Sequence, residues 1–250
     1  MLTRRLFRVA GVDGCKAGWF VAITSVTTKN ETDPSCEFNL KNVFIASTFA
    51  EVLSKTSDCK LVCVDIPIGL SDGPERRACD LAARKALGGK RASSVFPAPV
   101  RPCLTTNEYK TANAICRKLT GKGLSKQSFA LLEKIRQVDD LMTPELQRRV
   151  REIHPEISFW ALNDKQPILQ NKKTVPGQAR RHKLLQEIFS GLDSILAQAP
   201  ARGYMMDDAL DALVAAWTAG QTVLGKARTL PEKPELDGKG LRMEILCPVR

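Results

Sequence analysis

The chain has 250 residues, 43% of them hydrophobic and 26% charged, which suits a globular protein large enough to bury a core without disulfides. Eight cysteines without a Cys-x-x-Cys pair and only two histidines argue against a zinc site, and the formal net charge of +11 favours anionic partners, nucleic acid first. We expect a cytoplasmic protein with no membrane partner, because the sequence shows no signal peptide and no run of ~18 apolar residues.

The first part of the chain predicts strands and one short helix. Three runs are apolar or β-branched and of strand length: residues 8–13, 18–28 and 38–46. Their short connections, including a polar hairpin loop at 29–35, predict an antiparallel meander. Thr48, with Glu51 three residues later, forms a capping box that opens a short helix. The continuous apolar run 60–66 (KLVCVDI) then predicts a central strand buried on both faces.

From about residue 71 to 143 the pattern changes to helices, which we interpret as an insertion in a single domain covering residues 1–250. Asp72 and Pro74 are expected to open the first of these helices. The remaining segments are expected in this order: an extended proline-rich loop at 94–102, helices at 107–119 and 125–141, a short helix at 143–145, a strand at 150–154, a basic helix at 178–189, an amphipathic helix at 206–219 closed by Gly220, and a strand at 241–246.

Acidic residues stand where the apolar segments end. Asp13 ends the first strand, Asp65 ends the central strand, and Asp208 and Asp211 share one face of the amphipathic helix. Each acid alone is better explained as a turn cap or as part of a solvated face. Strand ends are where sites form in α/β folds, and carboxylate oxygens are the ligands that Mg²⁺ prefers. The combination therefore favours a metal site.

A second acidic candidate is the tripeptide His154-Pro155-Glu156, which follows a predicted strand. Glu156 could reach the same edge of the sheet, and His154 could position a water or contact a phosphate. A hydrogen-bonded turn histidine is an equally good interpretation of His154.

Eight motifs together resemble the DUF429 family of predicted nucleases, over a span from about residue 9 to 245. They lie at residues 11–19 (GVDGCKAGW), 64–70 (VDIPIGL), 79–84 (CDLAAR), 93–99 (SSVFPAP), 121–125 (GKGLS), 154–156 (HPE), 207–213 (DDALDAL) and 240–245 (GLRMEI). The resemblance implies a ribonuclease H-like α/β fold, similar to Holliday-junction resolvases of the RuvC type. Such a fold has a mixed sheet, with a three-strand antiparallel meander followed by parallel strands, flanked by helices.

The resemblance also implies metal-binding acids, which fall on Asp13, Asp65, Asp208 and Asp211. One departure is Asp65, because many nucleases of this fold carry Glu on the central strand. We therefore predict a nuclease that uses Mg²⁺ or Mn²⁺, with Asp13 shared between two ions ~3.5–4 Å apart. Asp65 would hold one ion and the two helical aspartates the other, while Glu156 or His154 would orient the attacking water.

Further residues are candidates for contacting the nucleic acid, through phosphate charge or base stacking. The candidates are Lys16, Arg76, Arg91, Ser93, Ser94, Phe96, Lys122 and Arg180, together with the basic residues Arg77, Lys172, Lys173 and Arg181. For any single one of them, a plain surface charge or a packed side chain explains the residue as well.

Two other functions remain open at this point. The segment Asp13-Gly14-Cys15-Lys16 resembles the first phosphate loop of phosphotransferases and ATPases of the sugar-kinase and actin type, although 250 residues is short for two such domains. The chain is alternatively a non-catalytic nucleic-acid-binding protein with the same fold. A homodimer is compatible with a resolvase-like role, and the sequence does not decide it.

Overall fold

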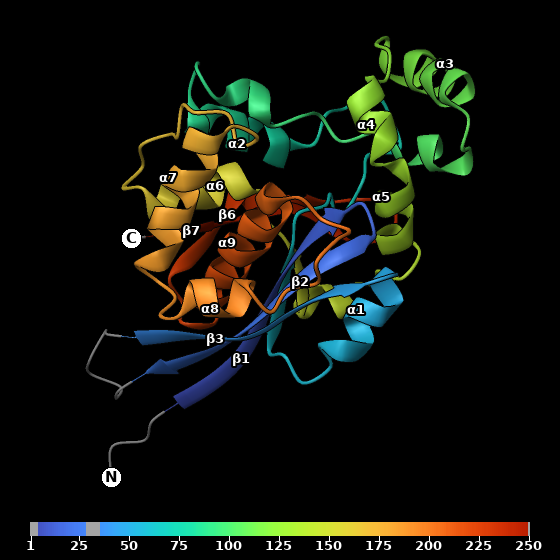
Figure 1. Cartoon of the computed structure of the whole chain (residues 1–250). Coiled ribbons are helices and arrows are strands. Elements are labelled where there is room, and N and C mark those ends of the chain that lie inside the picture. The colour runs from blue at the N-terminus through green and yellow to red at the C-terminus, as the bar shows by residue number, and fades with distance from the viewer. Residues whose placement is uncertain (1–4, 29–35, 250) are drawn as a thin grey trace. The chain divides into compact units, whose positions relative to one another are not determined.

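A computed structural model describes residues 5–28 and 36–249, which divide into two compact units (Figure 1). Unit 1 is drawn from residues 1–65, 149–228 and 246–250, and unit 2 from residues 66–148 and 229–245. Unit 2 thus contains the segment predicted as an insertion and adds a C-terminal piece of chain. The single-domain interpretation itself stays a prediction, and the hairpin loop expected at 29–35 lies outside the described residues.

Unit 1 is built on a five-stranded mixed sheet in the order β3-β2-β1-β4-β5. Strands β1, β2 and β3 form an antiparallel meander, whereas β4 runs parallel to β1 and β5 parallel to β4. The strand bounds are Arg5–Cys15, Gly18–Thr28, Cys36–Ala46, Leu61–Val64 and Val150–Glu152, from β1 to β5. This topology confirms the predicted ribonuclease H-like arrangement of a meander followed by parallel strands with flanking helices.

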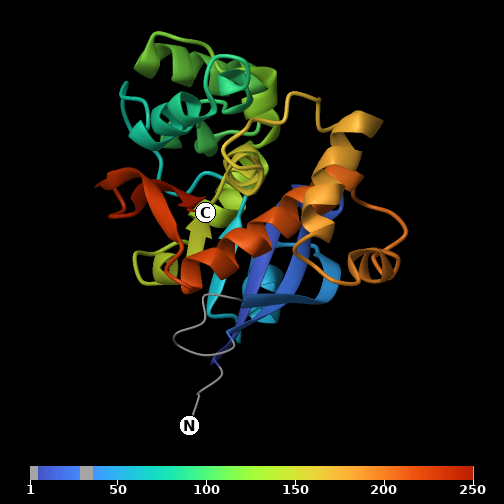
Figure 2. The same cartoon turned by 90° about the vertical axis from the view of Figure 1, so that its left-hand side faces the viewer.

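Helices cover both faces of this sheet (Figures 1 and 2). The long helix α9 (Met206–Val223) lies on one face, where a Cβ added to Gly11 of β1 would come within 2.0 Å of the Ala212 carbonyl oxygen. On the other face the short helix α1 (Phe49–Lys55) packs the Phe49 ring 5.1 Å from that of Trp19. Because strand side chains alternate between faces, odd-numbered residues of β1 point toward α9.

Three more helices complete unit 1: α6 (Pro155–Leu162), α7 (Val175–Gln186) and α8 (Leu192–Leu196). Helices α6 and α8 are too short for a periodic pattern and were not predicted. Gly220 does not close α9, which continues to Val223. A Cβ at Gly220 would lie 2.2 Å from the ring of Phe38, so this glycine serves helix-to-sheet packing and not a helix end.

Unit 2 is mainly helical and also contains most of the two-stranded sheet of β6 and β7, whose residues 227–228 and 246–248 belong to unit 1. Its elements are α2 (Ala78–Leu87), η1 (Ala92–Ser94), η2 (Arg101–Thr105), α3 (Tyr109–Thr120), α4 (Lys126–Ala130), α5 (Leu132–Asp139), η3 (Leu146–Arg148), β6 (Ala227–Leu236) and β7 (Arg242–Pro248). The single helix expected at 125–141 is therefore two helices, and β6 was not predicted.

The start of α2 also differs from the prediction, for an electrostatic reason. Asp72 does not cap this helix, because its carboxylate pairs with Arg101 at 3.2 Å. Arg101 also pairs with Asp139 and Asp237, and Lys239 reaches Asp139 at 3.0 Å. Helix α2 begins at Ala78, with Arg77 at its N-cap position. None of the helices in the described ranges combines the length and hydropathy that crossing a membrane requires.

Candidate metal centre

Three aspartates of unit 1 converge on one point. Asp13 lies near the end of β1, Asp65 directly follows β4, and Asp211 projects from α9. Each offers a carboxylate oxygen, and the three oxygens lie within 4.8 Å of one another. Asp13 and Asp211 are 7% and 1% exposed, and Asp65 is partly buried.

The sheet and helix explain why these side chains meet. Asp13 is two residues after Gly11, so strand alternation points it toward α9. The parallel register pairs Val12 with Val64, and the Asp65 amide donates to the Val12 carbonyl at 3.0 Å, which places Asp65 beside Asp13. The close approach of α9 at Gly11 then brings Asp211, next to Ala212, over the ends of both strands.

Burial and mutual repulsion make this cluster electrostatically costly. The pKa of Asp13 is raised well above its usual value, first by burial and then by the charges of Asp65 and Asp211. Burial also raises the pKa of Asp65 to about 7 and that of Asp211 to about 6, although Lys172 opposes both shifts. Buried carboxylates with raised pKa values mark functional sites more often than structural ones.

A lysine lies against the cluster. Lys172 donates from Nζ to Oδ2 of Asp211 at 2.5 Å. Burial alone would lower the pKa of Lys172, but the charges of Asp211, Asp13 and Asp65 outweigh burial and raise the pKa above its usual value. The sequence indicates Lys172 only as one of several candidate phosphate-binding residues, and no motif or spacing distinguishes it from its neighbour Lys173.

The donor set fits a divalent cation. With all three carboxylates ionised and Lys172 protonated, these four groups carry a formal charge of −2. Oδ1 of Asp211 is buried and has no hydrogen-bond partner among the described residues, whereas Oδ1 of Asp13 accepts from the Gly14 amide at 2.8 Å. Hard oxygen ligands and an uncompensated negative charge suit Mg²⁺ or Mn²⁺.

Asp208, the fourth predicted metal ligand, lies outside this group of three. Its Oδ2 accepts from the Met205 amide at 2.8 Å and so caps α9, as acidic residues in a first helical turn commonly do. Its charge still contributes to the raised pKa of Asp13. Asp208 therefore acts on the cluster through its charge while its carboxylate is engaged by the helix end.

Glu156 and His154 lie at the start of α6. Oε1 of Glu156 accepts from the guanidinium of Arg181 at 2.7 Å, and its charge raises the pKa values of Asp65 and Asp211. Nδ1 of His154 accepts from the Glu156 amide at 3.2 Å, which makes His154 the cap of α6. Arg181 is 0% exposed, so it neutralises Glu156 in the interior and is not available to a phosphate.

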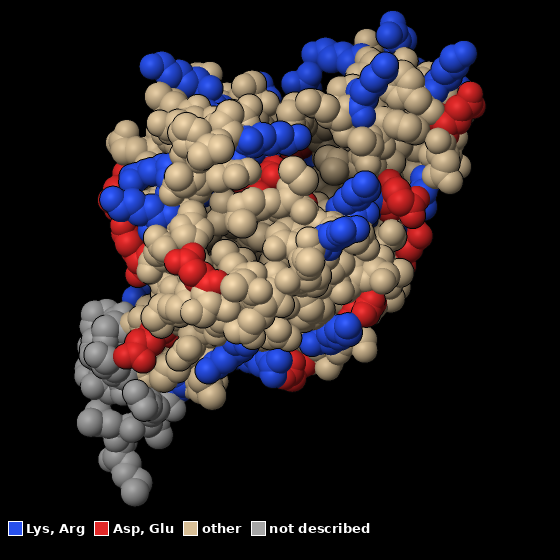
Figure 3. Space-filling view, viewed as in Figure 1, with Lys and Arg blue, Asp and Glu red and all other residues tan. Residues whose placement is uncertain are grey.

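The residues predicted to contact nucleic acid divide between the units. Lys16 and Arg180 belong to unit 1, and Arg180 donates to Oδ1 of Asn163 at 2.5 Å. Six belong to unit 2: Arg76, Arg91, Ser93, Ser94, Phe96 and Lys122. On the face seen in Figure 3, the Lys and Arg side chains form separate groups between uncharged areas and not one continuous band.

Comparisons with known proteins give one family and one solved structure. A family model described as "Protein of unknown function (DUF429)" matches residues 11–236, a span that contains all three clustered aspartates. No curated protein matches the chain. The chain is similar to a RuvC structure from Thermus thermophilus, with 12% sequence identity and a TM-score of 0.34, over 87% of this chain and 96% of that one.

Proposed function

This chain belongs to the DUF429 family of proteins of unknown function, and we propose that it is a metal-dependent nuclease that hydrolyses phosphodiester bonds of nucleic acid. The observation that supports the proposal is the convergence of Asp13, Asp65 and Asp211 within 4.8 Å. A purely structural role is a poor explanation for the cluster, since buried like charges destabilise a fold unless each one is compensated.

Asp13, Asp65 and Asp211 would hold Mg²⁺ or Mn²⁺, with Asp13 shared if two ions bind. Such an ion, when bound, increases the acidity of water and offsets the negative charge that develops on a phosphodiester. Asp208 would add negative charge from the same helix. The net charge of +11 over the whole chain favours the approach of a polyanion.

We assign Glu156 to orienting the attacking water, because its charge reaches Asp65 and Asp211 and Arg181 fixes its carboxylate. His154 is a positioning residue in this scheme, since its ring caps the helix turn that carries Glu156. Replacing His154 should therefore lower the rate without changing the affinity for metal.

The test is a cleavage screen with Mg²⁺ and Mn²⁺ across single-stranded, duplex and junction DNA and RNA. Asp13→Asn should lower cleavage by more than about 100-fold, because even changes outside the ligand shell of a metal cost 10–100-fold. Asp193→Asn is the matched control, since it makes the same chemical change at an exposed residue of unit 1 that pairs with His182.

Cleavage that survives Asp13→Asn, or the absence of cleavage on every substrate with either metal, contradicts the proposal. Light scattering of the active protein, alone and with a junction, tests whether a homodimer accompanies the activity.

A further inference from the structure

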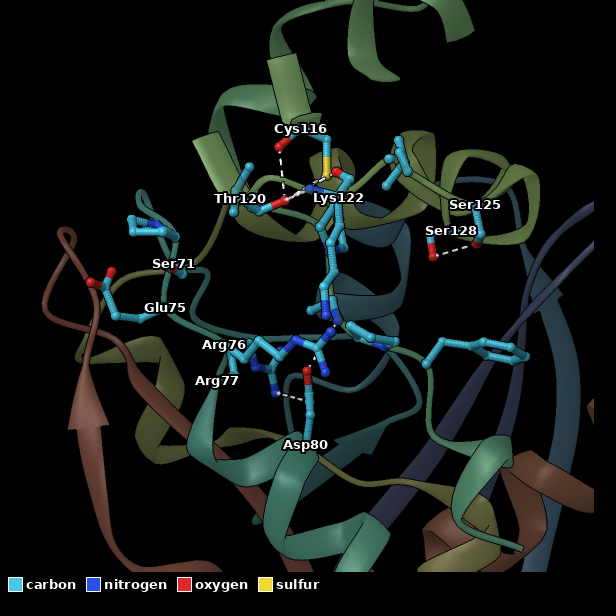
Figure 4. Close-up of a pocket in the computed structure, with 18 residues that line it drawn as sticks. Ser71, Glu75, Arg76, Arg77, Asp80, Cys116, Thr120, Lys122, Ser125 and Ser128 are labelled. Atoms are coloured by element: carbon cyan, nitrogen blue, oxygen red, sulfur yellow. Dashed lines mark hydrogen bonds and ion pairs between the residues drawn. The ribbon is translucent and has the colours of Figure 1, made fainter. Parts of the chain in front are cut away.

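Unit 2 contains a pocket of its own. Its volume is about 400 Å³, and it lies between the loop before α2, the proline-rich segment 96–100 and the turn that joins α3 to α4 (Figure 4). This volume falls within the range of ~300–1,000 Å³ that is typical of small-molecule sites. Every residue that lines it belongs to unit 2, so the pocket is complete without the aspartate cluster.

Two cations are available to a ligand at this pocket. Arg76 and Lys122 line it, both are exposed, and neither forms an ion pair with any residue in the described ranges. Gly121, at φ 71°, ends α3 and turns the chain toward Lys122, whose amide donates to Oγ1 of Thr120 at 3.2 Å. Figure 4 shows the Lys122 side chain reaching down toward Arg77 and Asp80.

Two other charged groups of the pocket, Arg77 and Asp80, pair with each other. Arg77 is buried and pairs with Asp80 at 3.5 Å, and Oδ2 of Asp80 accepts from the Ala98 amide at 3.0 Å. Their charges therefore cancel locally, and Glu75 is the remaining acid. Three cations against two carboxylates leave the lining with a formal charge of +1, which favours an anion.

The rest of the lining favours a flat organic group attached to that anion. The Phe96 side chain is 48% exposed at the pocket although it is large and apolar. An exposed ring and unpaired cations in the lining of one pocket can stack a base and neutralise its phosphate. The hydroxyls of Ser125 and Ser128, 2.8 Å apart, add hydrogen-bonding groups to the wall.

We propose that this pocket binds a nucleoside monophosphate unit, with its phosphate between Arg76 and Lys122 and its base against Phe96. The unit comes either from a free mononucleotide or from the end of a phosphorylated strand. The proposal goes beyond cleavage at the aspartate cluster and does not depend on it.

Calorimetry on the full chain, with EDTA present to remove divalent ions, tests this site. The probes are adenosine 5′-monophosphate, adenosine, inorganic phosphate and a 5′-phosphorylated hexanucleotide. Adenosine monophosphate should bind more tightly than either of its parts. Equal affinity for the monophosphate and the hexanucleotide identifies a free mononucleotide as the ligand, and much tighter binding of the hexanucleotide identifies a strand end.

Variants locate the binding. Arg76→Gln and Lys122→Gln should each weaken binding of the monophosphate by about 10-fold, because each removes a charge-assisted contact. Phe96→Leu should weaken it by about 10-fold through lost stacking and leave phosphate binding unchanged. Lys126→Gln, an exposed lysine of α4 outside the lining, is the matched control and should have no effect.

The proposal is overturned if neither nucleotide probe binds at millimolar concentration, if inorganic phosphate binds as well as the monophosphate, or if the control weakens binding as much as Lys122→Gln. Asp13→Asn should retain nucleotide binding, so failure of the nuclease proposal is distinguishable from failure here. Circular dichroism melts verify that each variant is folded.

Discussion

Unit 1 and unit 2 each bring three aspartates together, and they neutralise them differently. In unit 2, Arg101 pairs with all of Asp72, Asp139 and Asp237. Lys239 pairs with Asp139 as well. The Asp237 carboxylate also accepts from the amides of Leu70, Lys239 and Leu241 at 2.8–2.9 Å. In unit 1, Lys172 faces Asp13, Asp65 and Asp211, and one oxygen of Asp211 lacks a partner among the described residues.

The pKa values show the consequence of this difference. Burial alone would raise the pKa of Asp237, but Arg101 and the backbone amides outweigh it, so the pKa lies below its usual value. The pKa values of Asp13, Asp65 and Asp211 all lie above theirs. The first group is satisfied by the chain itself, whereas the second needs a cation or a proton from outside. That contrast is the reason why we propose a metal site in unit 1 and a structural role for the carboxylates of unit 2.

The largest effect is expected from removing the central cation of unit 2. Arg101→Met should lower the free energy of unfolding by about 3–5 kcal/mol, because it leaves carboxylates that were paired with the guanidinium uncompensated. Urea denaturation measures this change. Arg8→Met, which breaks an exposed pair with Asp58, is the control and should cost within about 1 kcal/mol. Equal effects of the two variants would remove the distinction between the groups.

Divalent metal should stabilise the aspartate cluster of unit 1. At a Mg²⁺ or Mn²⁺ concentration 100 times its Kd, the free energy of unfolding should rise by about 2.7 kcal/mol. Asp211→Asn should abolish most of this gain, and Asp193→Asn should leave it intact. The measurement is thermal unfolding over a series of metal concentrations. A gain that persists in Asp211→Asn would place the binding elsewhere.

The pH dependence of the metal-free protein follows from the raised pKa values. A carboxyl whose pKa is higher in the folded state binds more protons there, so stability falls as pH rises from the unfolded pKa, near 4, toward the folded value. With the pKa of Asp211 at about 6 and that of Asp65 at about 7, we expect the free energy of unfolding to fall as the pH rises from 4 to 7.

Urea denaturation in EDTA across this pH range measures the loss, and Asp65→Asn should make the profile flatter. Saturating metal should oppose the loss, because it stabilises the ionised carboxylates. If these aspartates instead made the metal-free protein more stable as the pH rises from 4 to 7, the cluster would already be neutralised by the chain itself.

The smallest expected effect concerns the lysine. Lys172→Met should tighten metal binding by about 10-fold, because it removes a positive charge that competes with the ion for Asp211. The neighbouring, exposed Lys173→Met is the matched control and should change the affinity little. Calorimetric titration with Mn²⁺ measures both. Weaker metal binding in Lys172→Met would instead make Lys172 part of the support that holds the carboxylates in place.

The sequence was sufficient for the sheet and for the convergence of three aspartates, because both follow from local patterns. Strand alternation and strand ends identified Asp13 and Asp65, and helical spacing identified Asp211. The same spacing also selected Asp208, since periodicity does not show whether an acid in a first helical turn caps the helix. Lys172 is 39 residues from Asp211 in the chain, and only tertiary structure brings the two together. Asp72 was misjudged for a similar reason, because its partner Arg101 is distant in sequence.

The glycine at position 11 determines how closely α9 approaches β1 beside the aspartate cluster. Gly11 has no side chain, so the backbone of α9 lies directly against β1, and a methyl group there would overlap the Ala212 carbonyl. Asp13 is two residues from Gly11 on β1, and Asp211 is next to Ala212 on α9. The separation of their carboxylates is therefore a property of backbone packing and does not depend on loop conformation. Any side chain at residue 11 would push α9 away from β1 and so change the separation of these carboxylates, without altering any charged group.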